Sequence, residues 1–175
     1  MVSNSFMLGV IPPAYNLKPL FQTVSGVEGI RLTLCCREQE WNYASKLYAP
    51  INSQNVEIIH LSGSELTCHY ENSDIFALLW STYEYLDFGM PVKVFETLGY
   101  GVPILTLDGT EAARFITQEN IGWVVRSVEE ASDLLEYLRD HREDIDAMKQ
   151  RVSEVRLRHT WEERARQVVQ TLTKN

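Results

Sequence analysis

The chain has 175 residues, of which 45% are hydrophobic and 23% are charged, and its net charge is −8. This length and composition suit one domain with a core of ordinary size. The longest uninterrupted apolar run, Ile75–Trp80, is far shorter than the roughly 20 residues that span a bilayer. The first residues lack a signal-peptide pattern, and three cysteines form no disulfide framework or zinc pattern. We therefore expect a cytoplasmic protein without a transmembrane segment.

The acidic balance argues against nucleic acid as a partner. The chain has 16 lysines and arginines against 24 aspartates and glutamates, and it lacks the basic stripe that binds a phosphate backbone. An anionic ligand would need a local device, such as one lysine at a helix N-terminus.

In the first half of the chain, short apolar runs alternate with segments of helical periodicity. Asn16 and Ser62 are suitable N-caps for two of the helices. The run Ile75–Trp80 has the continuous apolarity of a parallel strand that is buried on both faces. We predict strands at 6–11, 31–36, 56–60 and 75–80, and helices at 16–25, 40–47 and 62–70.

The second half continues this alternation. A loop over 81–90 leads to a helix that starts at Pro91 and ends at Gly101, as proline and glycine preferences favour. Ser127 and Thr160 each begin a capping box. We predict strands at 103–107 and 121–125, and helices at 110–118, 128–157 and 160–172.

This order of elements predicts an α/β fold, a Rossmann-like parallel sheet of about six strands flanked by helices. We expect residues 1–175 to form a single domain that residues 127–175 close with C-terminal helices. The sequence contains neither Gly-x-Gly-x-x-Gly nor a Walker motif, which argues against a dinucleotide-dependent dehydrogenase and a P-loop enzyme.

The helix after the loop over 81–90 carries an unusual pair of charges. Lys93 lies in its first turn, where the helix dipole disfavours a cation by roughly 0.3–1 kcal/mol, and Glu96 follows at i+3. A phosphate bound at the helix N-terminus would remove this conflict, and Glu96 could then accept hydrogen bonds from a ribose diol. The alternative is an exposed lysine and glutamate on an ordinary surface helix.

This segment resembles a known family. The run Lys93–Leu105, followed by Glu111 and Gly122–Val125, resembles the C-terminal half of a GT-B glycosyltransferase. The resemblance is closest to the retaining group called glycosyl transferases group 1, or glycosyltransferase family 4. Members carry a run like K-x-x-E-x-x-x-x-G-x-P-V, then a glutamate and a Gly-x-x-V strand. A weaker resemblance extends over the rest of the chain.

The resemblance implies a domain that binds the nucleotide diphosphate of an activated sugar, with no metal and no cofactor. Glu96 matches the glutamate that holds the ribose hydroxyls, and the helix start at Lys93 matches the segment that faces the phosphates. Arg37 and Lys18 are the cations nearest to the ends of the first two strands. The expected donor-binding residues are Glu96, Lys93, Thr97, Val92, Phe88, Gly89, Arg37 and Lys18.

The implied reaction is transfer of a sugar from a nucleotide-diphospho-sugar to an acceptor hydroxyl with retention, as a hexosyltransferase does in polysaccharide or glycolipid synthesis. An N-terminal acceptor domain is absent from the chain, so we expect the fragment to be inactive alone. The expected partners are the donor and this N-terminal domain, which would also supply a peripheral contact at the inner face of the membrane.

Two positions differ from the family pattern and leave other hypotheses open. Phe88 stands where the family often has the first glutamate of Glu-x7-Glu, and residues 12–16 lack the basic pair that usually follows the first strand. A second hypothesis is therefore a non-catalytic binding or assembly module with a degenerate donor site. A third is a GT-B nucleotide-sugar epimerase.

Overall fold

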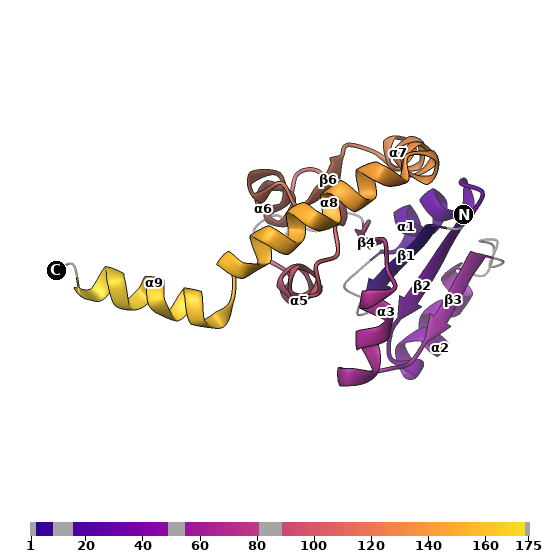
Figure 1. Ribbon diagram of the computed structural model, residues 1–175. Helices are drawn as coiled ribbons and strands as arrows, with labels where there is room; N and C mark the ends of the chain where they lie inside the picture. The colour runs from indigo at the N-terminus through magenta and orange to yellow at the C-terminus, as the bar shows by residue number, and fades with distance from the viewer. Residues whose placement is uncertain (1–2, 9–15, 49–54, 81–88, 174–175) are drawn as a thin grey trace.

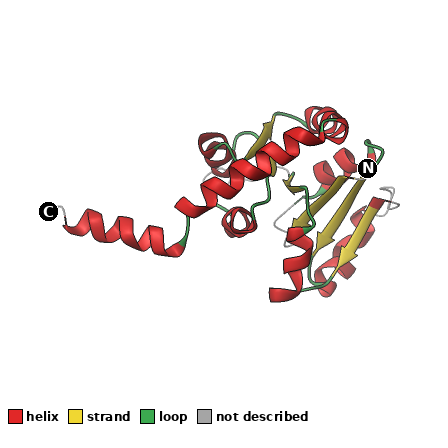
Figure 2. Ribbon diagram, in the orientation of Figure 1, coloured by secondary structure: helices red, strands yellow, loops and turns green. Residues whose placement is uncertain are grey.

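The computed structural model describes residues 3–8, 16–48, 55–80 and 89–173. Within these ranges, parallel strands form one sheet in the order β3-β2-β1-β4-β5-β6, and helices flank the strands (Figure 2). The prediction of a parallel α/β sheet is confirmed. The strands are β1 (Ser3–Leu8), β2 (Ile30–Cys35), β3 (Val56–Ile59), β4 (Ile75–Leu78), β5 (Ile104–Leu107) and β6 (Gly122–Val125).

The helices follow the strands in alternation, because parallel neighbours in a sheet must be joined by crossover connections. Figure 1 shows α7 beside α1 and α8 crossing toward α9. The α-helices are α1 (Lys18–Ser25), α2 (Glu38–Tyr48), α3 (Thr67–Glu71), α5 (Val92–Tyr100), α6 (Glu111–Glu119), α7 (Val128–Asp140), α8 (Arg142–Val155) and α9 (Trp161–Thr173), and the 3₁₀ turns are η2 (Gly63–Leu66) and η3 (Arg156–Arg158).

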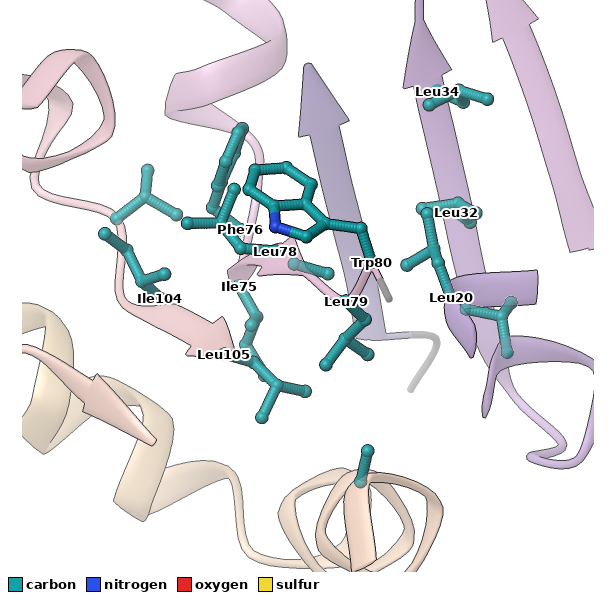
Figure 3. Close-up of a cluster of buried hydrophobic side chains, with 14 of the residues drawn as sticks. Leu20, Leu32, Leu34, Ile75, Phe76, Leu78, Leu79, Trp80, Ile104 and Leu105 are labelled. Carbon is teal, nitrogen blue, oxygen red and sulfur yellow. The ribbon is translucent and has the colours of Figure 1, made fainter. Parts of the chain in front are cut away.

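The core lies around the middle of the sheet. Every residue of β4 is buried, in agreement with the continuous apolar run that predicted a strand covered on both faces. Figure 3 shows side chains of β4 and of the two residues after it near those of β5. The labelled ones are Ile75, Phe76, Leu78, Leu79, Trp80, Ile104 and Leu105. This packing fixes β4 beside β5 and so fixes the helix between them.

Helix α5 begins and ends where the sequence predicts. Pro91 is its N-cap, and Gly101 ends it in the left-handed region with φ 77°, a conformation that glycine adopts without steric cost. Val94 and Leu98 are buried against the core. The opposite face of the helix, which carries Lys93 and Glu96, is thereby held at the surface.

Several predicted boundaries shift for identifiable reasons. The predicted helix over 62–70 is divided into η2 and α3, although Ser62 and Glu65 do form the predicted capping box. The predicted helix over 128–157 breaks at His141, whose φ of −123° and ψ of 67° are not helical. The break reorients α8 so that Arg142 and Lys149 reach the Asp74 carboxylate. The predicted first strand over 6–11 lies at Ser3–Leu8, and residues 9–11 lie outside the described residues.

Candidate functional site

The sheet reverses its direction of growth between β1 and β4. Strands are added outward from β1 to β3, and the chain then returns to place β4 on the other side of β1. In open α/β sheets, ligands bind at such a switch point, outside the carboxyl ends of the strands. Residues 9–15, after β1, and residues 81–88, after β4, lie outside the described residues, so the described part of this edge comes from β2, β3 and α5.

A hollow of about 590 Å³ lies at this edge. Its walls come from the end of β2 with the start of α2, from the loop between β3 and η2, and from the first turns of α5. Residues that line it are 35–40, 60–63, Leu66, Lys93 and Glu96. The volume falls within the range of roughly 300–1,000 Å³ that is typical of small-molecule sites.

Lys93 and Glu96 form an ion pair at the rim of this hollow. The Lys93 Nζ and a Glu96 carboxylate oxygen are 2.6 Å apart, and the two side chains are 33% and 32% exposed. An ion pair at this exposure contributes about 0–1 kcal/mol to stability. The free N–H groups of the first turn of α5 lie at the same end of the helix as Lys93, so this end can hold an anion.

Arg37 brings a second cation to the hollow. It lies two residues after the end of β2, its side chain is 82% exposed, and its guanidinium lies 3.4 Å from the Glu40 carboxylate. Glu38 also lines the hollow. Among its described lining residues, the two cations thus face three carboxylates, those of Glu38, Glu40 and Glu96.

The cysteines of the hollow are neutral thiols. Burial raises the pKa of Cys36 to about 12, with further contributions from Cys35 and the charge of Glu40. Burial also raises the pKa of Cys35, whose Sγ donates to the Leu61 carbonyl at 3.3 Å. Thiols in this state are poor nucleophiles and poor metal ligands.

The loop after β3 is tied to the end of β2. The Nδ1 of His60 lies 2.8 Å from the Cys36 carbonyl, so this nitrogen carries the proton of the bond. Within the described residues, no three His, Cys, Asp or Glu side chains are grouped so that they could hold a metal ion. The described lining of the hollow thus offers a ligand main-chain groups and a few charged side chains.

Of the other predicted site residues, those that the structure describes do not line the hollow. Val92 is 77% exposed at the start of α5, whereas Thr97 is fully buried on the inner side of that helix. Lys18 is exposed at the first residue of α1, and Gly89 is half-buried just before α5. Phe88 lies outside the described residues.

Part of the wall of the hollow was not predicted from the sequence. The residues Cys36, His60, Ser62 and Gly63 line the hollow, but they belong to no motif of known chemistry. A positional signal exists, because each of them lies at the carboxyl end of a predicted strand or just after it, where ligands of parallel sheets bind.

The chain is similar to proteins of known family and structure. The model of the family described as "Glycosyl transferase-like" matches residues 17–170. No curated protein matches the chain.

The described helices include no candidate for a membrane span, since none combines the length and the apolarity that crossing a bilayer needs.

Solved structures share the fold at low sequence identity. Sucrose-phosphate synthase from Thermosynechococcus elongatus aligns with a TM-score of 0.80 at 12% identity, over 98% of this chain and 45% of that one. Anabaena HepE in complex with UDP aligns with a TM-score of 0.78 at 11% identity, over 98% and 49%. The C-terminal domain of a glycosyl transferase group 1 family protein from Francisella tularensis aligns with a TM-score of 0.69 at 11% identity, over 87% and 83%.

These coverages show how the chain relates to larger proteins. It spans between 34% and 45% of the first three solved structures that it matches, but 83% of the isolated C-terminal domain. At identities this low, the structural similarity shows the fold alone. That fold is the one of the C-terminal domain of GT-B glycosyltransferases.

Proposed function

The chain belongs to the glycosyl transferase-like family, and on that premise we propose that it is the donor-binding domain of a retaining, metal-independent glycosyltransferase. Its substrate would be a nucleotide-diphospho-sugar. The observation that supports this most strongly is the hollow at the carboxyl end of the sheet, into which separate elements bring Arg37, Lys93 and Glu96. HepE, which has the same fold, has been solved with UDP, so this fold accommodates a nucleotide diphosphate.

Each group of the hollow has a chemical counterpart in such a donor. The ribose diol would donate hydrogen bonds to the Glu96 carboxylate. The diphosphate would lie at the N-terminus of α5, where free N–H groups and Lys93 meet. The base would then lie between the end of β2 and the loop at residues 60–63, where main-chain groups are available for hydrogen bonding.

The transfer itself would need little more from this domain than stabilisation of the leaving group. The bond between the anomeric carbon and the diphosphate oxygen breaks, and the diphosphate leaves with the electron pair. The oxygen of the acceptor hydroxyl bonds to the same face of the sugar, and its proton would pass to the departing diphosphate oxygen. The N–H groups of α5 and the Lys93 ammonium would stabilise the negative charge that develops on the diphosphate. These fixed dipoles and charges would take the place of a metal ion.

The remaining half of the cleft would come from an N-terminal domain. Such a domain would bind the acceptor, a polysaccharide or glycolipid hydroxyl, and contact the inner face of the membrane from the cytoplasm. Two features leave surface for such a neighbour. Helix α9 leads away from the body of the domain (Figure 1), and Val92 and Val169 are 77% and 58% exposed. Because the N-terminal domain would supply half of the cleft, we expect the isolated chain to bind a donor weakly and to transfer no sugar.

A second candidate is a binding module whose donor site is degenerate. Both cations of the hollow are already paired, Lys93 with Glu96 and Arg37 with Glu40. A diphosphate would have to compete with these carboxylates for its cations. Such internal ion pairs are expected in a domain that has kept the fold but no longer binds a nucleotide.

A titration with the diphosphates of uridine, guanosine and adenosine, followed by NMR, separates the two. The transferase proposal predicts saturable shifts around residues 89–100 for one nucleotide, with a dissociation constant between roughly micromolar and millimolar. Glu96→Ala should weaken this binding, whereas Glu136→Ala, on the exposed face of α7, should leave it unchanged. Binding that ignores Glu96→Ala would contradict the assignment, and no binding of any of the three would favour the degenerate module.

A further inference from the structure

Strand β6 forms the outer edge of one side of the sheet. It pairs with β5 and with no other strand in the described part of the chain. A second hollow of about 590 Å³, which we call the edge hollow, lies along it. The residues that line the edge hollow are Thr117, Asn120, 122–125, Glu130, Asp133 and Leu134. None of them lines the hollow of the proposed donor site.

The main chain of β6 presents hydrogen-bonding groups to the edge hollow. The Val125 carbonyl accepts a hydrogen bond from the Asp108 N–H at 2.8 Å, so the main chain of Val125 faces β5. In a parallel ladder every second residue bonds to the same neighbour. The N–H and C=O groups of Gly122 and Val124 therefore point away from β5. Such groups at a sheet edge are the ones with which an added strand pairs.

The two walls of the edge hollow lie on different faces of the sheet. The sheet grows in opposite directions from β1 and from β4, so right-handed connections place α1 and α6 on opposite faces. Helix α7 packs against α1 (Figure 1). The end of α6, with Thr117 and Asn120, thus borders β6 on one face, and α7, with Glu130 and Asp133, borders it on the other.

The wall that α7 forms is acidic. Asp133 is exposed, and the Glu130 carboxylate is held by the Arg126 N–H at 2.8 Å. Residues 128–138 contain four carboxylates and no lysine or arginine, and the described lining of the edge hollow has no lysine or arginine either. Because side chains alternate along a strand, every second side chain of an added strand would face these carboxylates. The wall is therefore complementary to basic side chains at alternate positions.

We propose that the edge of β6 is a docking site for an extended, basic segment of another protein, which joins the sheet as a further strand. The main chain of this segment pairs with Gly122 and Val124, and its lysines or arginines face Glu130 and Asp133. A second copy of this chain is a poorer occupant, because two β6 edges related by a two-fold axis would bring their acidic walls together. The proposal is independent of the donor-binding function, since the two hollows share no residue.

The first test is a titration of the whole chain, followed by NMR, with a short capped peptide in which lysine alternates with valine. The peptide should shift the amide signals of Gly122 and Val124. It should bind at least about tenfold more tightly than the same peptide with glutamate in place of lysine, because like charges would then face each other. Added salt should reduce this preference. Equal binding of the two peptides, or shifts that leave β6 unaffected, would overturn the proposal.

The second test concerns the main-chain pairing. Val124→Pro removes an N–H that points away from β5, so the ladder between β5 and β6 keeps its hydrogen bonds. This variant should bind the lysine peptide at least about tenfold more weakly, since it loses a pairing group and gains a steric block. Undiminished binding would contradict the pairing. Hydrogen exchange of residues in β5 is the control for an intact sheet.

Modified peptides test the same pairing without changing the protein. One peptide carries N-methyl groups on its lysines and the other carries them on its valines. Alternate N–H groups of a strand point to the same side, so one of these peptides should bind as the unmodified peptide does and the other should not bind. Any other pattern would overturn the addition of a strand.

The third test concerns the acidic wall. Asp133→Asn should weaken binding of the lysine peptide by about threefold, and Asp133→Lys should reverse the preference between the lysine and glutamate peptides. Glu136→Gln removes the same charge from α7 outside the lining of the edge hollow and should have a clearly smaller effect. Equal effects of Asp133→Asn and Glu136→Gln would show that net charge alone acts, which would overturn the site. A dimer of the chain alone that protects β6 from hydrogen exchange would assign the edge to a second copy and refute the basic partner.

Discussion

Asp74 lies just before β4 and carries a buried charge that α8 neutralises. Its side chain is 6% exposed and accepts hydrogen bonds from Arg142, one at 2.6 Å, and from Lys149 at 3.1 Å. A buried carboxylate is tolerated only when such partners compensate for its lost hydration. The cluster thus fixes α8 to the amino end of β4, at the edge of the sheet opposite the hollow.

Replacing this carboxylate should therefore destabilise the fold. Asp74→Asn removes the buried charge that Arg142 and Lys149 share, which should lower the free energy of unfolding by on the order of 3 kcal/mol. Urea denaturation of the chain measures this loss. The control is Asp146→Asn, because Asp146 is 67% exposed and lies 3.9 Å from the same Arg142. It should change stability by less than about 0.5 kcal/mol, and equal losses for the two variants would contradict the role of Asp74.

The thiols offer a prediction about pH. Because burial raises the pKa of Cys36 to about 12, this cysteine ionises in the unfolded chain before it ionises in the folded one. Its contribution to stability is therefore full below its ordinary value near 9.0 and falls as the pH rises from there toward 12. In the folded chain at pH 8.5, iodoacetamide should modify the exposed Cys68 first. Rapid modification of Cys36, detected by peptide mass spectrometry, would show that the burial assigned to it is wrong.

At the scale of elements, the ends of the helices are set by local side chains. Thr110 Oγ1 accepts a hydrogen bond from the Ala113 N–H at 3.1 Å, and Ser127 Oγ accepts one from the Glu130 N–H at 3.2 Å. Both were predicted as helix starts. These bonds satisfy N–H groups that a helix leaves without a partner, so α6 and α7 begin at the same places that the sequence indicates.

The cap of α6 is suited to a direct test. Thr110→Ala removes the acceptor of the Ala113 N–H and should lower the free energy of unfolding by about 1 kcal/mol. Thr117→Ala changes the same residue type on the exposed side of α6 and should be neutral or slightly stabilising. Thermal unfolding of the two variants measures the difference. A Thr110→Ala variant as stable as the wild type would show that the cap contributes nothing.

The strand β6 depends on a glycine. A Cβ at Gly122 would overlap the backbone of Ile104 in the neighbouring strand β5, so the two strands can approach only if position 122 has no side chain. The glycine that resembles the first position of a Gly-x-x-V strand thus has a packing reason in this chain. Gly122→Ala should destabilise the edge of the sheet, with early hydrogen exchange in β6 as the measurable result. Unchanged protection of residues 122–125 would contradict this account.

At the scale of the whole molecule, α9 stands apart from the sheet. Figure 1 shows this helix leading away from the body of the domain. Helix α8, in contrast, packs on the body of the domain, with Val152 and Val155 fully buried. An isolated helix of 13 residues is marginal in water. The N-terminal domain proposed above would give α9 a surface to cover.

This predicts unequal protection along the C-terminal helices. In the isolated chain, the amides of α9 should exchange with deuterium at least about tenfold faster than those of α8, because local opening there breaks few tertiary contacts. In a longer protein that includes the N-terminal domain, the protection of α9 should rise. Hydrogen-exchange mass spectrometry measures both, and equal protection of α8 and α9 in the isolated chain would contradict the prediction.

The class of fold and the order of its elements could be predicted from local patterns of residues. Continuous apolarity marked Ile75–Trp80 as a central strand, and proline, glycine and hydroxyl side chains marked the ends of α5, α6 and α7. These signals are local, because they depend on a backbone preference or on a hydrogen bond to a residue nearby in the chain. The resemblance around Lys93 and Glu96 likewise needed only their spacing, and the family match agrees with it.

Which residues meet depends on packing between elements that are far apart in the chain. The break at His141 has no proline or glycine to signal it, and beyond it Arg142 and Lys149 lie beside the distant Asp74. The wall of the hollow joins residues that follow β2 and β3 to Lys93 and Glu96 of α5, and Tyr70 stacks on Tyr100 because α3 packs on α5. Such pairings depend on how strands order themselves in the sheet, and no local pattern of residues encodes the distance between two segments that are far apart in the chain.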